Sequence, residues 1–252
     1  GQFEINWNFN DALTTADQVA FFKFMVKSIA EKHGLRATFM PKPFINLTGN
    51  GCHVHLSVWT DDRKTNLFED DKGELGLSQL GYHFLGGLMH HAASMCAITN
   101  PTVNSYKRIN APRTISGATW SPSSITYGGN NRTHMVRIPD GGRAEYRLPD
   151  CAANPYLLLA SILVAGMHGV EKQIDPGKRL DIDMYAEGHK VKGAKRLPLN
   201  LLDAIRNFEK DSFLRGALGA EVCDAYTKLK HAEWNAYCRH LTQWERDNTL
   251  DC

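Results

Sequence analysis

Two histidines and a serine alternate along a segment that follows a glycine-containing loop. The loop, Gly49-Asn50-Gly51, leads directly into Cys52-His53-Val54-His55-Leu56-Ser57. In an extended strand successive side chains point to opposite faces, so His53, His55 and Ser57 share one face at intervals of about 7 Å. The apolar residues between them face the other way and can pack against a core. Imidazoles and a hydroxyl on such a face can hold a metal ion and a phosphate group.

Charged side chains alternate in the same way further along the chain. Thr133 to Pro139 and Arg143 to Leu148 predict two strands, and Asp140-Gly141-Gly142 between them indicates a hairpin turn. The second strand places Arg143, Glu145 and Arg147 on one face. Residues 1–9 also alternate, with Glu4 on the polar face. Carboxylates here could bind cations, and guanidinium groups could bind anions.

Helical periodicity accounts for most of the remaining chain. We expect helices over residues 15–32, 77–99 and 155–174 and through most of 200–250, with a short strand at 36–40. Residues 109–131 predict a long irregular loop, and loops of this length in compact domains are often functional. The simplest architecture is an α+β fold: a curved antiparallel sheet with helices packed on its back and a charged concave front.

Composition limits the classes of function. The chain has 252 residues, 42% of them hydrophobic and 22% charged, and a net charge of +2, which gives no electrostatic reason to expect nucleic acid or an acidic membrane as a partner. Apolar runs stay well short of the roughly 20 residues that span a bilayer. The six cysteines form no CxxC pair, which favours reduced thiols in a cytoplasmic protein.

Several motifs, taken in order, resemble the catalytic domain of glutamine synthetases. They cover residues 1 to about 170: Gly1-Gln2-Phe3-Glu4, Thr38 to Pro43, Gly49 to Ser57, Asn100 to Arg108, Asn131-Arg132, Arg137-Ile138-Pro139, Glu145 to Asp150 and Ala152 to Tyr156. Asn110 to Thr114 and Ser116 to Pro122 look like a branch with type III-like glutamine synthetases and γ-glutamylmethylamide synthetases. The whole chain, residues 1–252, is therefore expected to be one such catalytic domain.

The resemblance implies an ATP-dependent ligase. Glutamate would attack the γ-phosphate of ATP, and ammonia or an amine would capture the γ-glutamyl phosphate. Such a reaction needs Mg²⁺ or Mn²⁺ to offset the triphosphate charge and guanidinium groups around the moving phosphoryl group.

The resemblance also assigns roles to individual residues. The implied metal ligands are Glu4 for one cation and His53 and Glu145 for a second. The implied ATP contacts are His55, Ser57, Arg137, Arg143 and Phe9, and a core position is an equally good interpretation of Phe9. Gly49, Arg108 and Arg147 would bind glutamate, and Arg132 would act in catalysis with Arg108 and Arg147. Tyr185 aligns with a tyrosine that is adenylylated in some bacterial members, but a plain surface tyrosine is the preferred interpretation.

Two departures from the family pattern qualify this picture. The family's other metal-binding glutamates and its small amino-terminal domain lie upstream of the Gly-Gln-x-Glu strand, with which this chain begins. We therefore expect an amino-terminally truncated domain that is inactive alone and belongs to a ring-forming homo-oligomer when full length.

The second departure concerns the amine. Ammonia-using members carry a glutamate shortly after the arginine that matches Arg108, whereas residues 109–131 contain no acidic residue and the aligned position falls near Thr114. Losing this carboxylate should weaken ammonium capture, and Trp120 could line a pocket for an alkyl group, so we expect a primary alkylamine such as methylamine as acceptor. The alternatives are a glutamine synthetase proper, a non-catalytic relative, or a phosphoryl transferase resembling guanidino kinases.

Overall fold

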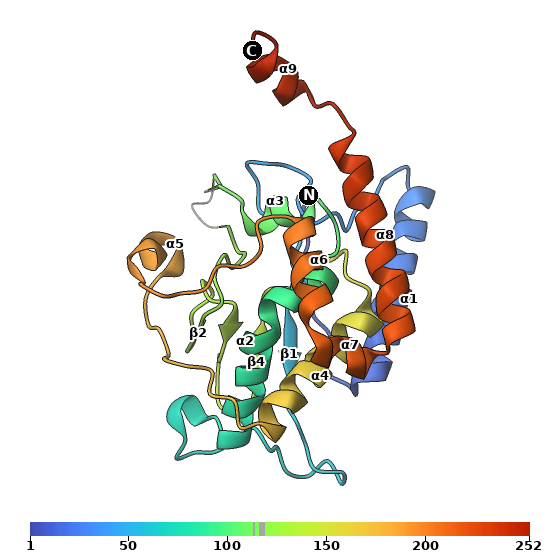
Figure 1. Ribbon diagram of the computed structural model, residues 1–252. Coiled ribbons are helices and arrows are strands. Elements are labelled where there is room, and N and C mark those ends of the chain that lie inside the picture. Colours follow the sequence, from blue (N-terminus) through green and yellow to red (C-terminus); the bar gives the residue numbers. More distant parts are fainter. Residues whose placement is uncertain (113, 116–118) are drawn as a thin grey trace.

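A small sheet lies among helices in the computed structural model of the chain, which describes residues 1–112, 114, 115 and 119–252 (Figure 1). Its strands are β1 (Val54–Leu56), β2 (Tyr127–Gly128), β3 (Val136–Arg137) and β4 (Ala144–Tyr146), in the order β1-β4-β3-β2. Strand β4 is antiparallel to both of its neighbours. The α+β fold is thus confirmed.

One strand pairing differs from the expected antiparallel pattern. Strands β2 and β3 pair in parallel, with Tyr127 opposite Val136 and Gly128 opposite Arg137. Strand β2 falls inside the segment that the sequence predicts to be a loop. The chain turns back through residues 129–135 before β3, so both strands run in the same direction and the sheet is mixed.

The alternation in β1 and β4 sorts their side chains as predicted. Val54 and Leu56 pack against the hydrophobic core, and Ala144 and Tyr146 are fully buried in it. The residues between them, His55 and Glu145, therefore lie on the opposite face of the sheet. This face carries the candidate site.

The predicted strands over residues 1–9 and 36–40 are wrong for the described residues, because neither segment is assigned as a strand. Phe3 and Phe9 are 88% and 89% exposed. Trp7 packs on Phe22 with ring centroids 5.4 Å apart. Alternation gives a strand only where another strand supplies backbone hydrogen bonds, and among the described residues no strand does so here.

The three longest predicted helices of the first 174 residues are confirmed. Helix α1 (Ala12–Lys32) begins three residues before the predicted start and is capped by Asp11, and Gly34 follows it with a φ of 68°. Helix α2 (Gln79–Thr99) is capped by Ser78, and α4 (Pro155–Glu171) by Asn154 with proline in its first turn.

Helices α2 and α4 pack closely through glycine. A Cβ on Gly87 would overlap the Ala165 carbonyl oxygen, and a Cβ on Gly169 would overlap the His83 carbonyl oxygen. Only glycine permits this backbone approach. The resulting helix pair forms a rigid layer at the centre of the core.

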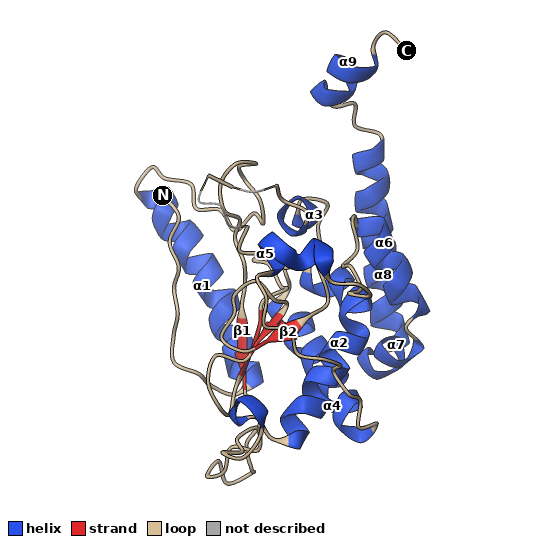
Figure 2. Ribbon diagram, turned by 90° about the vertical axis from the view of Figure 1, so that its left-hand side faces the viewer, coloured by secondary structure: helices blue, strands red, loops and turns tan. Residues whose placement is uncertain are grey.

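Eight further helices are present among the described residues. They are η1 (Glu74–Gly76), α3 (Ser105–Ile109), α5 (Met184–Glu187), η2 (Gly188–Lys190), α6 (Leu201–Lys210), α7 (Ser212–Leu218), α8 (Ala220–Cys238) and α9 (Gln243–Thr249). In Figure 2 the strands lie between α1 and the group formed by α2, α6, α7 and α8, and α9 projects from the body.

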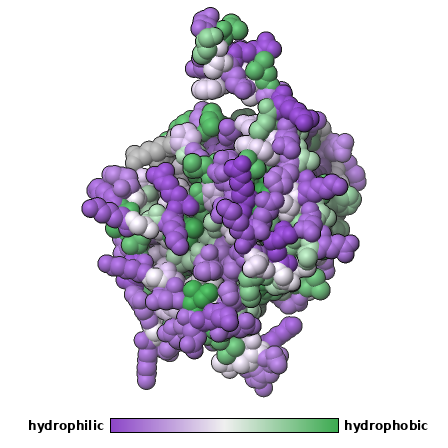
Figure 3. Space-filling view, in the orientation of Figure 1, coloured by the Kyte–Doolittle hydropathy of each residue, from purple (hydrophilic) through white to green (hydrophobic). Residues whose placement is uncertain are grey.

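The surface carries no extended apolar face in the view of Figure 3, where hydrophilic residues predominate and apolar residues lie between them. Among the residues that the structure describes, no helix is both long enough and apolar enough to cross a membrane.

Candidate active site

The strand register places Glu145 at the centre of a polar cluster. Glu145 on β4 lies opposite His55 of β1 and opposite Arg137 of β3. Directly opposed residues have Cβ atoms about 4.5–5.5 Å apart, so their side chains meet on the same face. Strand β1 and the hairpin of β3 and β4, about 80 residues further along the chain, thus bring an imidazole, a carboxylate and a guanidinium group together.

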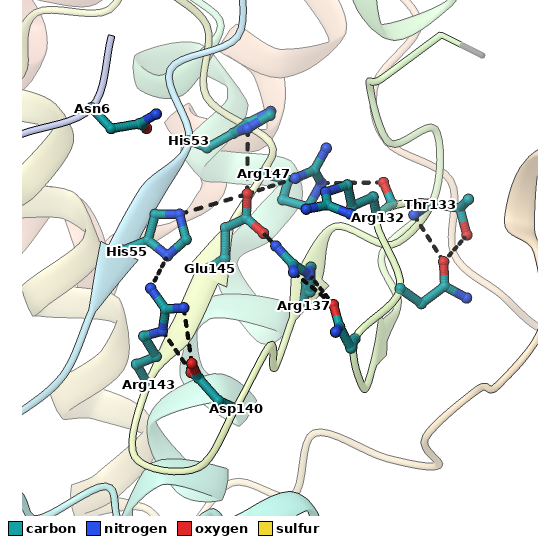
Figure 4. A network of polar contacts seen from close by, with 12 residues as sticks. Asn6, His53, His55, Arg132, Thr133, Arg137, Asp140, Arg143, Glu145 and Arg147 are labelled. Atoms are coloured by element: carbon teal, nitrogen blue, oxygen red, sulfur yellow. Dashed lines mark hydrogen bonds and ion pairs between the residues drawn. The ribbon is translucent and has the colours of Figure 1, made fainter. Parts of the chain in front are cut away.

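The Glu145 carboxylate binds two guanidinium groups (Figure 4). Arg147 Nη1 donates to Oε1 at 2.6 Å, and Arg137 Nη1 donates to Oε2 at 2.7 Å. Burial acts to raise the pKa of Glu145, but the hydrogen bond from Arg137 and the charge of Arg147 outweigh it and hold the pKa below its usual value. Glu145 is therefore ionised at neutral pH, and two cations against one anion leave excess positive charge.

His53 lies next to the same carboxylate and is neutral. Its Nδ1 is 3.4 Å from Glu145 Oε1. Burial and the charges of Arg147 and Arg108 lower the pKa of His53 to about 3. Its Nε2 is buried without a hydrogen-bond partner among the described residues. A neutral imidazole with an unpartnered nitrogen, beside an ionised carboxylate, is suited to bind a metal ion.

The structure does not bring all three predicted metal ligands together. Glu4 is exposed in the unpaired segment 1–9 and accepts a hydrogen bond from Asn6 Nδ2 at 3.3 Å. Within the described part of the chain, no three His, Cys, Asp or Glu side chains form a set that could hold a metal ion. His53 and Glu145 are adjacent as the sequence predicts, whereas Glu4 does not join them.

The residues expected to contact ATP fall into two groups. Arg137 and His55 belong to the Glu145 cluster, and His55 Nδ1 is 3.3 Å from Arg143 Nη1. Arg143 itself donates two hydrogen bonds to the Asp140 carboxylate, at 2.6 and 3.0 Å. Ser57 is exposed and accepts a hydrogen bond from Trp59 Nε1 at 2.9 Å. Phe9 is exposed and lies outside the cluster, so the equally weighed core position is wrong for it.

Arg108 approaches the cluster from α3. It is almost completely buried, and its guanidinium group donates to the carbonyl oxygens of Leu148 and Arg147, at 2.8 and 3.2 Å. Burial lowers the pKa of Arg108, and the nearby Asp150 opposes this shift. The contacts fix the guanidinium group beside β4, on the side where His53 lies.

Gly49 contacts the Arg108 side chain. A Cβ at this position would overlap the Pro41 carbonyl oxygen and lie 3.2 Å from Arg108 Cγ. The Pro41 carbonyl already accepts a hydrogen bond from the Asn50 amide at 2.8 Å. The glycine is therefore needed by the fold itself, in addition to the predicted role of leaving room for substrate.

Arg132 has an exposed side chain on a fixed backbone. Its carbonyl oxygen accepts hydrogen bonds from Arg147 Nε at 3.1 Å and from the Tyr185 hydroxyl at 3.4 Å. Tyr185 is half-buried, and its interpretation as a plain surface tyrosine stays a prediction.

Sequence reasoning missed two partners of the arginines. Asn130 Oδ1 accepts from Arg137 Nε and Nη2, at 2.9 and 2.6 Å. Asp150 is buried near Arg108 and hydrogen-bonded to Asn100. Both residues adjoin or belong to motifs that the sequence analysis quoted, and this adjacency is the signal that could have found them.

The segment without acidic residues, 109–131, is described only in part. Arg113 and Ser116-Gly117-Ala118, which belong to the branch-specific motifs, lie outside the described residues. Thr114 is buried, and Trp120 is 41% exposed with a φ of 56°. The Thr119 side chain reaches Tyr185, so this part of the loop lies beside the arginines.

Comparison with known proteins gives consistent matches. The profile of the family described as "Glutamine synthetase, catalytic domain" matches residues 1–249. A "Glutamine synthetase" of Rhizobium leguminosarum bv. phaseoli is 67% identical over 251 residues, and a "Glutamate--methylamine ligase" of Methyloversatilis universalis is 48% identical over 256; each alignment covers 100% of this chain, and 58% and 57% of the relative. A solved structure described as "GmaS/ADP complex-Conformation 1" aligns with a TM-score of 0.93 at 68% identity, covering 98% of this chain and 56% of that one. The chain thus spans little more than half the length of these proteins.

Replacing the central carboxylate should destabilise the fold. In Glu145→Gln the amide keeps the shape but removes the charge that two buried arginines share, so we expect a loss of about 3–5 kcal/mol in unfolding free energy. The exposed Arg143 pair is the control: Asp140→Asn should cost less than about 1 kcal/mol. Chemical denaturation at pH 7 measures both variants.

The same comparison has a defined pH dependence. Because the folded-state pKa of Glu145 is depressed, its contribution is fully present above the ordinary value of 4.5 and is lost as pH falls through the folded-state pKa. The stability difference between wild type and Glu145→Gln should therefore shrink below pH 4.5. A difference that stays constant into strong acid would contradict this account of the cluster.

Alanine at Gly49 should also destabilise the protein. The added Cβ would overlap the Pro41 carbonyl, and overpacking of this kind costs about 1–3 kcal/mol. Gly216 in α7 provides the opposite control, because a Cβ there meets nothing within 4 Å and alanine should stabilise the helix by about 0.5–1 kcal/mol. Equal effects of the two variants on thermal unfolding would show that the close approach at Gly49 is unimportant.

Proposed function

Because the chain belongs to the glutamine synthetase family, we propose that the full-length gene product is an ATP-dependent ligase that joins the γ-carboxyl group of glutamate to an amine. A γ-carboxylate oxygen attacks the γ-phosphorus of ATP, and ADP leaves. The amine nitrogen then attacks the carbonyl carbon of the γ-glutamyl phosphate, phosphate leaves, and the nitrogen loses a proton. Every intermediate in this sequence carries negative charge on phosphoryl or carboxyl oxygens.

The observation that carries the proposal is the arginine cluster around Glu145. Arg137 and Arg147 share one carboxylate, and Arg108 is buried close by. Such an excess of fixed guanidinium groups favours an anion, and donors that are already oriented stabilise developing charge without reorganisation. Arg147 and Arg108 are assigned to the glutamate carboxylates, with Gly49 beside them.

The remaining roles follow the same arrangement. Arg137, Arg143 and His55 form one connected group next to the cluster and are assigned to the ATP phosphates, with Ser57 further along β1. Phe9 is assigned to the adenine. Arg132 projects into solvent from the edge of the cluster and is assigned to the transferring phosphoryl group.

A divalent cation, Mg²⁺ or Mn²⁺, fits part of the site. His53 has an unpartnered buried nitrogen and Glu145 an ionised carboxylate, and both would hold the cation; Glu4 is assigned to a second cation through the family motif alone. When bound, such a cation neutralises phosphate charge and makes the phosphorus more electrophilic. Glu145 would then be shared between the metal and the arginines.

The acceptor is proposed to be a primary alkylamine such as methylamine. Residues 109–131 contain no carboxylate to bind ammonium, and Trp120 is partly exposed on the described portion of this loop. The similar proteins named for methylamine ligation and GmaS support this choice, whereas the relatives named glutamine synthetase support ammonia, which is the alternative acceptor.

Two further proposals concern the whole protein. All six cysteines are free thiols, which supports a cytoplasmic location. The family membership supports a ring-forming homo-oligomer. A non-catalytic relative is disfavoured because the charged cluster is intact, and a charged cluster that binds nothing would cost stability.

Amine competition tests the proposed acceptor. With the full-length gene product, ATP and glutamate, we expect kcat/KM for methylamine to exceed that for ammonia by at least about tenfold, because one methyl group in an apolar pocket is worth about 10- to 200-fold. Trp120→Ala should reduce kcat/KM for methylamine and leave that for ammonia nearly unchanged. A preference of the wild type for ammonia would exclude the alkylamine, and loss of both activities in the variant would remove Trp120 from the pocket.

A further inference from the structure

A short segment around α5 is hydrogen-bonded to the turn that carries Arg132. The Asn131 side chain donates through Nδ2 to the Ile182 carbonyl oxygen at 2.8 Å. The backbone amide of Met184 donates to the Thr133 hydroxyl at 2.9 Å. The Thr133 hydroxyl in turn donates to Asn131 Oδ1 at 2.7 Å. Residues on both sides of Arg132 are thus held by residues more than 45 positions away along the chain.

The segment is itself fixed at its start. The Asp183 carboxylate caps α5 by accepting from the amides of Tyr185 and Ala186, at 2.8 and 3.2 Å. Met184 is buried and anchors the helix to the body. The cap sets the direction in which the Tyr185 side chain leaves the helix, which is toward the Arg132 turn.

Tyr185 makes the contact closest to the arginines. Its hydroxyl donates to the Arg132 carbonyl oxygen at 3.4 Å, and Arg147 Nε donates to the same oxygen at 3.1 Å. Arg147 then binds Glu145. The phenol, the Arg132 backbone, Arg147 and the central carboxylate therefore form one continuous chain of hydrogen bonds.

Burial keeps the phenol able to donate. Burial raises the pKa of Tyr185, against the opposing influence of the Thr119 side chain and the charges of Arg147 and Arg108. The hydroxyl therefore keeps its proton at neutral pH. A neutral donor adds a hydrogen bond beside the arginines without cancelling any of their charge.

We propose that Tyr185 is a positioning residue that, with the hydrogen bonds of residues 182–184, fixes the backbone of Arg132 and the orientation of Arg147 for phosphoryl transfer. The Arg132 guanidinium is exposed and free to reach an anion, while the backbone from which it projects is fixed at several points. A fixed Arg132 backbone reduces the number of conformations open to the Arg132 side chain. The side chain therefore loses less entropy when it binds the transition state. The inference rests on the proposed ligase function.

Removing only the hydroxyl tests the role of Tyr185. In the full-length gene product, Tyr185→Phe should lower kcat about two- to tenfold, as expected for one hydrogen bond, while KM for the amine changes less than twofold and the melting temperature is unchanged. Thr133→Ala removes the hydrogen bond from the Met184 amide and should also lower kcat. Tyr82→Phe is the matched control. The Tyr82 hydroxyl also donates to a backbone carbonyl oxygen, that of Glu74 at 2.7 Å, but outside the Glu145 cluster. The kcat of this variant should equal that of the wild type.

A double-mutant cycle with Arg132→Lys separates positioning from general stability. If Tyr185 acts through Arg132, Tyr185→Phe should lower kcat by less than twofold further in the Arg132→Lys background. Independent, multiplicative losses would overturn the inference while leaving the ligase function intact.

If the wild type joins no amine to glutamate, the dissociation constant of ATP is measured instead for the same four proteins. Coupling between Tyr185 and Arg132 in ATP binding would then support the positioning role, although the proposed reaction had failed. Absence of coupling in both rate and binding would overturn it.

Discussion

The site depends on one carboxylate being held between two guanidinium groups in a nearly closed environment. Buried charges are costly unless they are paired and hydrogen-bonded, and Glu145 satisfies both Arg137 and Arg147 in this way. The antiparallel register fixes the carboxylate opposite Arg137 on one side and His55 on the other. Without that register Arg137 would lose its buried ion-pair partner, so the positions of the strands and the chemistry of the site are inseparable.

The same pairing explains why the cluster attracts anions. One anion does not neutralise two cations, and Arg108 adds a further buried guanidinium group that donates to the backbone directly after β4. The site therefore retains an attraction for carboxylate and phosphate oxygens. It also keeps His53 neutral, because nearby positive charge and burial oppose its protonation. A neutral imidazole, a shared carboxylate and surplus guanidinium groups form a combination suited to a metal-bound nucleotide and an acidic substrate.

Backbone contacts position these groups as much as side-chain contacts do. Gly49 fits against Pro41 and Arg108, and the Arg132 carbonyl receives donors from Arg147 and Tyr185. The Tyr185 contact joins segments that are 53 residues apart in the sequence. Hydrogen bonds to main-chain oxygens thus help to hold the arginine-bearing segments in place.

Local patterns in the sequence were sufficient for much of the fold. Alternation identified the faces of β1 and β4, the hairpin signal at Asp140-Gly141-Gly142 joined β3 to β4, and periodicity with capping residues located α1, α2 and α4. The family motifs singled out His53, Glu145 and the arginines. These features depend on neighbours within a few residues, so the sequence by itself determines them.

Only the tertiary structure decided which of those residues meet. Residues 1–9 alternate like a strand but lie exposed, because a strand requires a partner that periodicity does not supply; Glu4 consequently stays apart from His53 and Glu145. Asn130 as a partner of Arg137 and the parallel pairing of β2 with β3 are set by how the chain turns between them, and the half-buried position of Tyr185 is set by its contact with the Arg132 carbonyl, 53 residues away. Such contacts depend on how the helices and strands pack in three dimensions, and no local spacing of residue types encodes them.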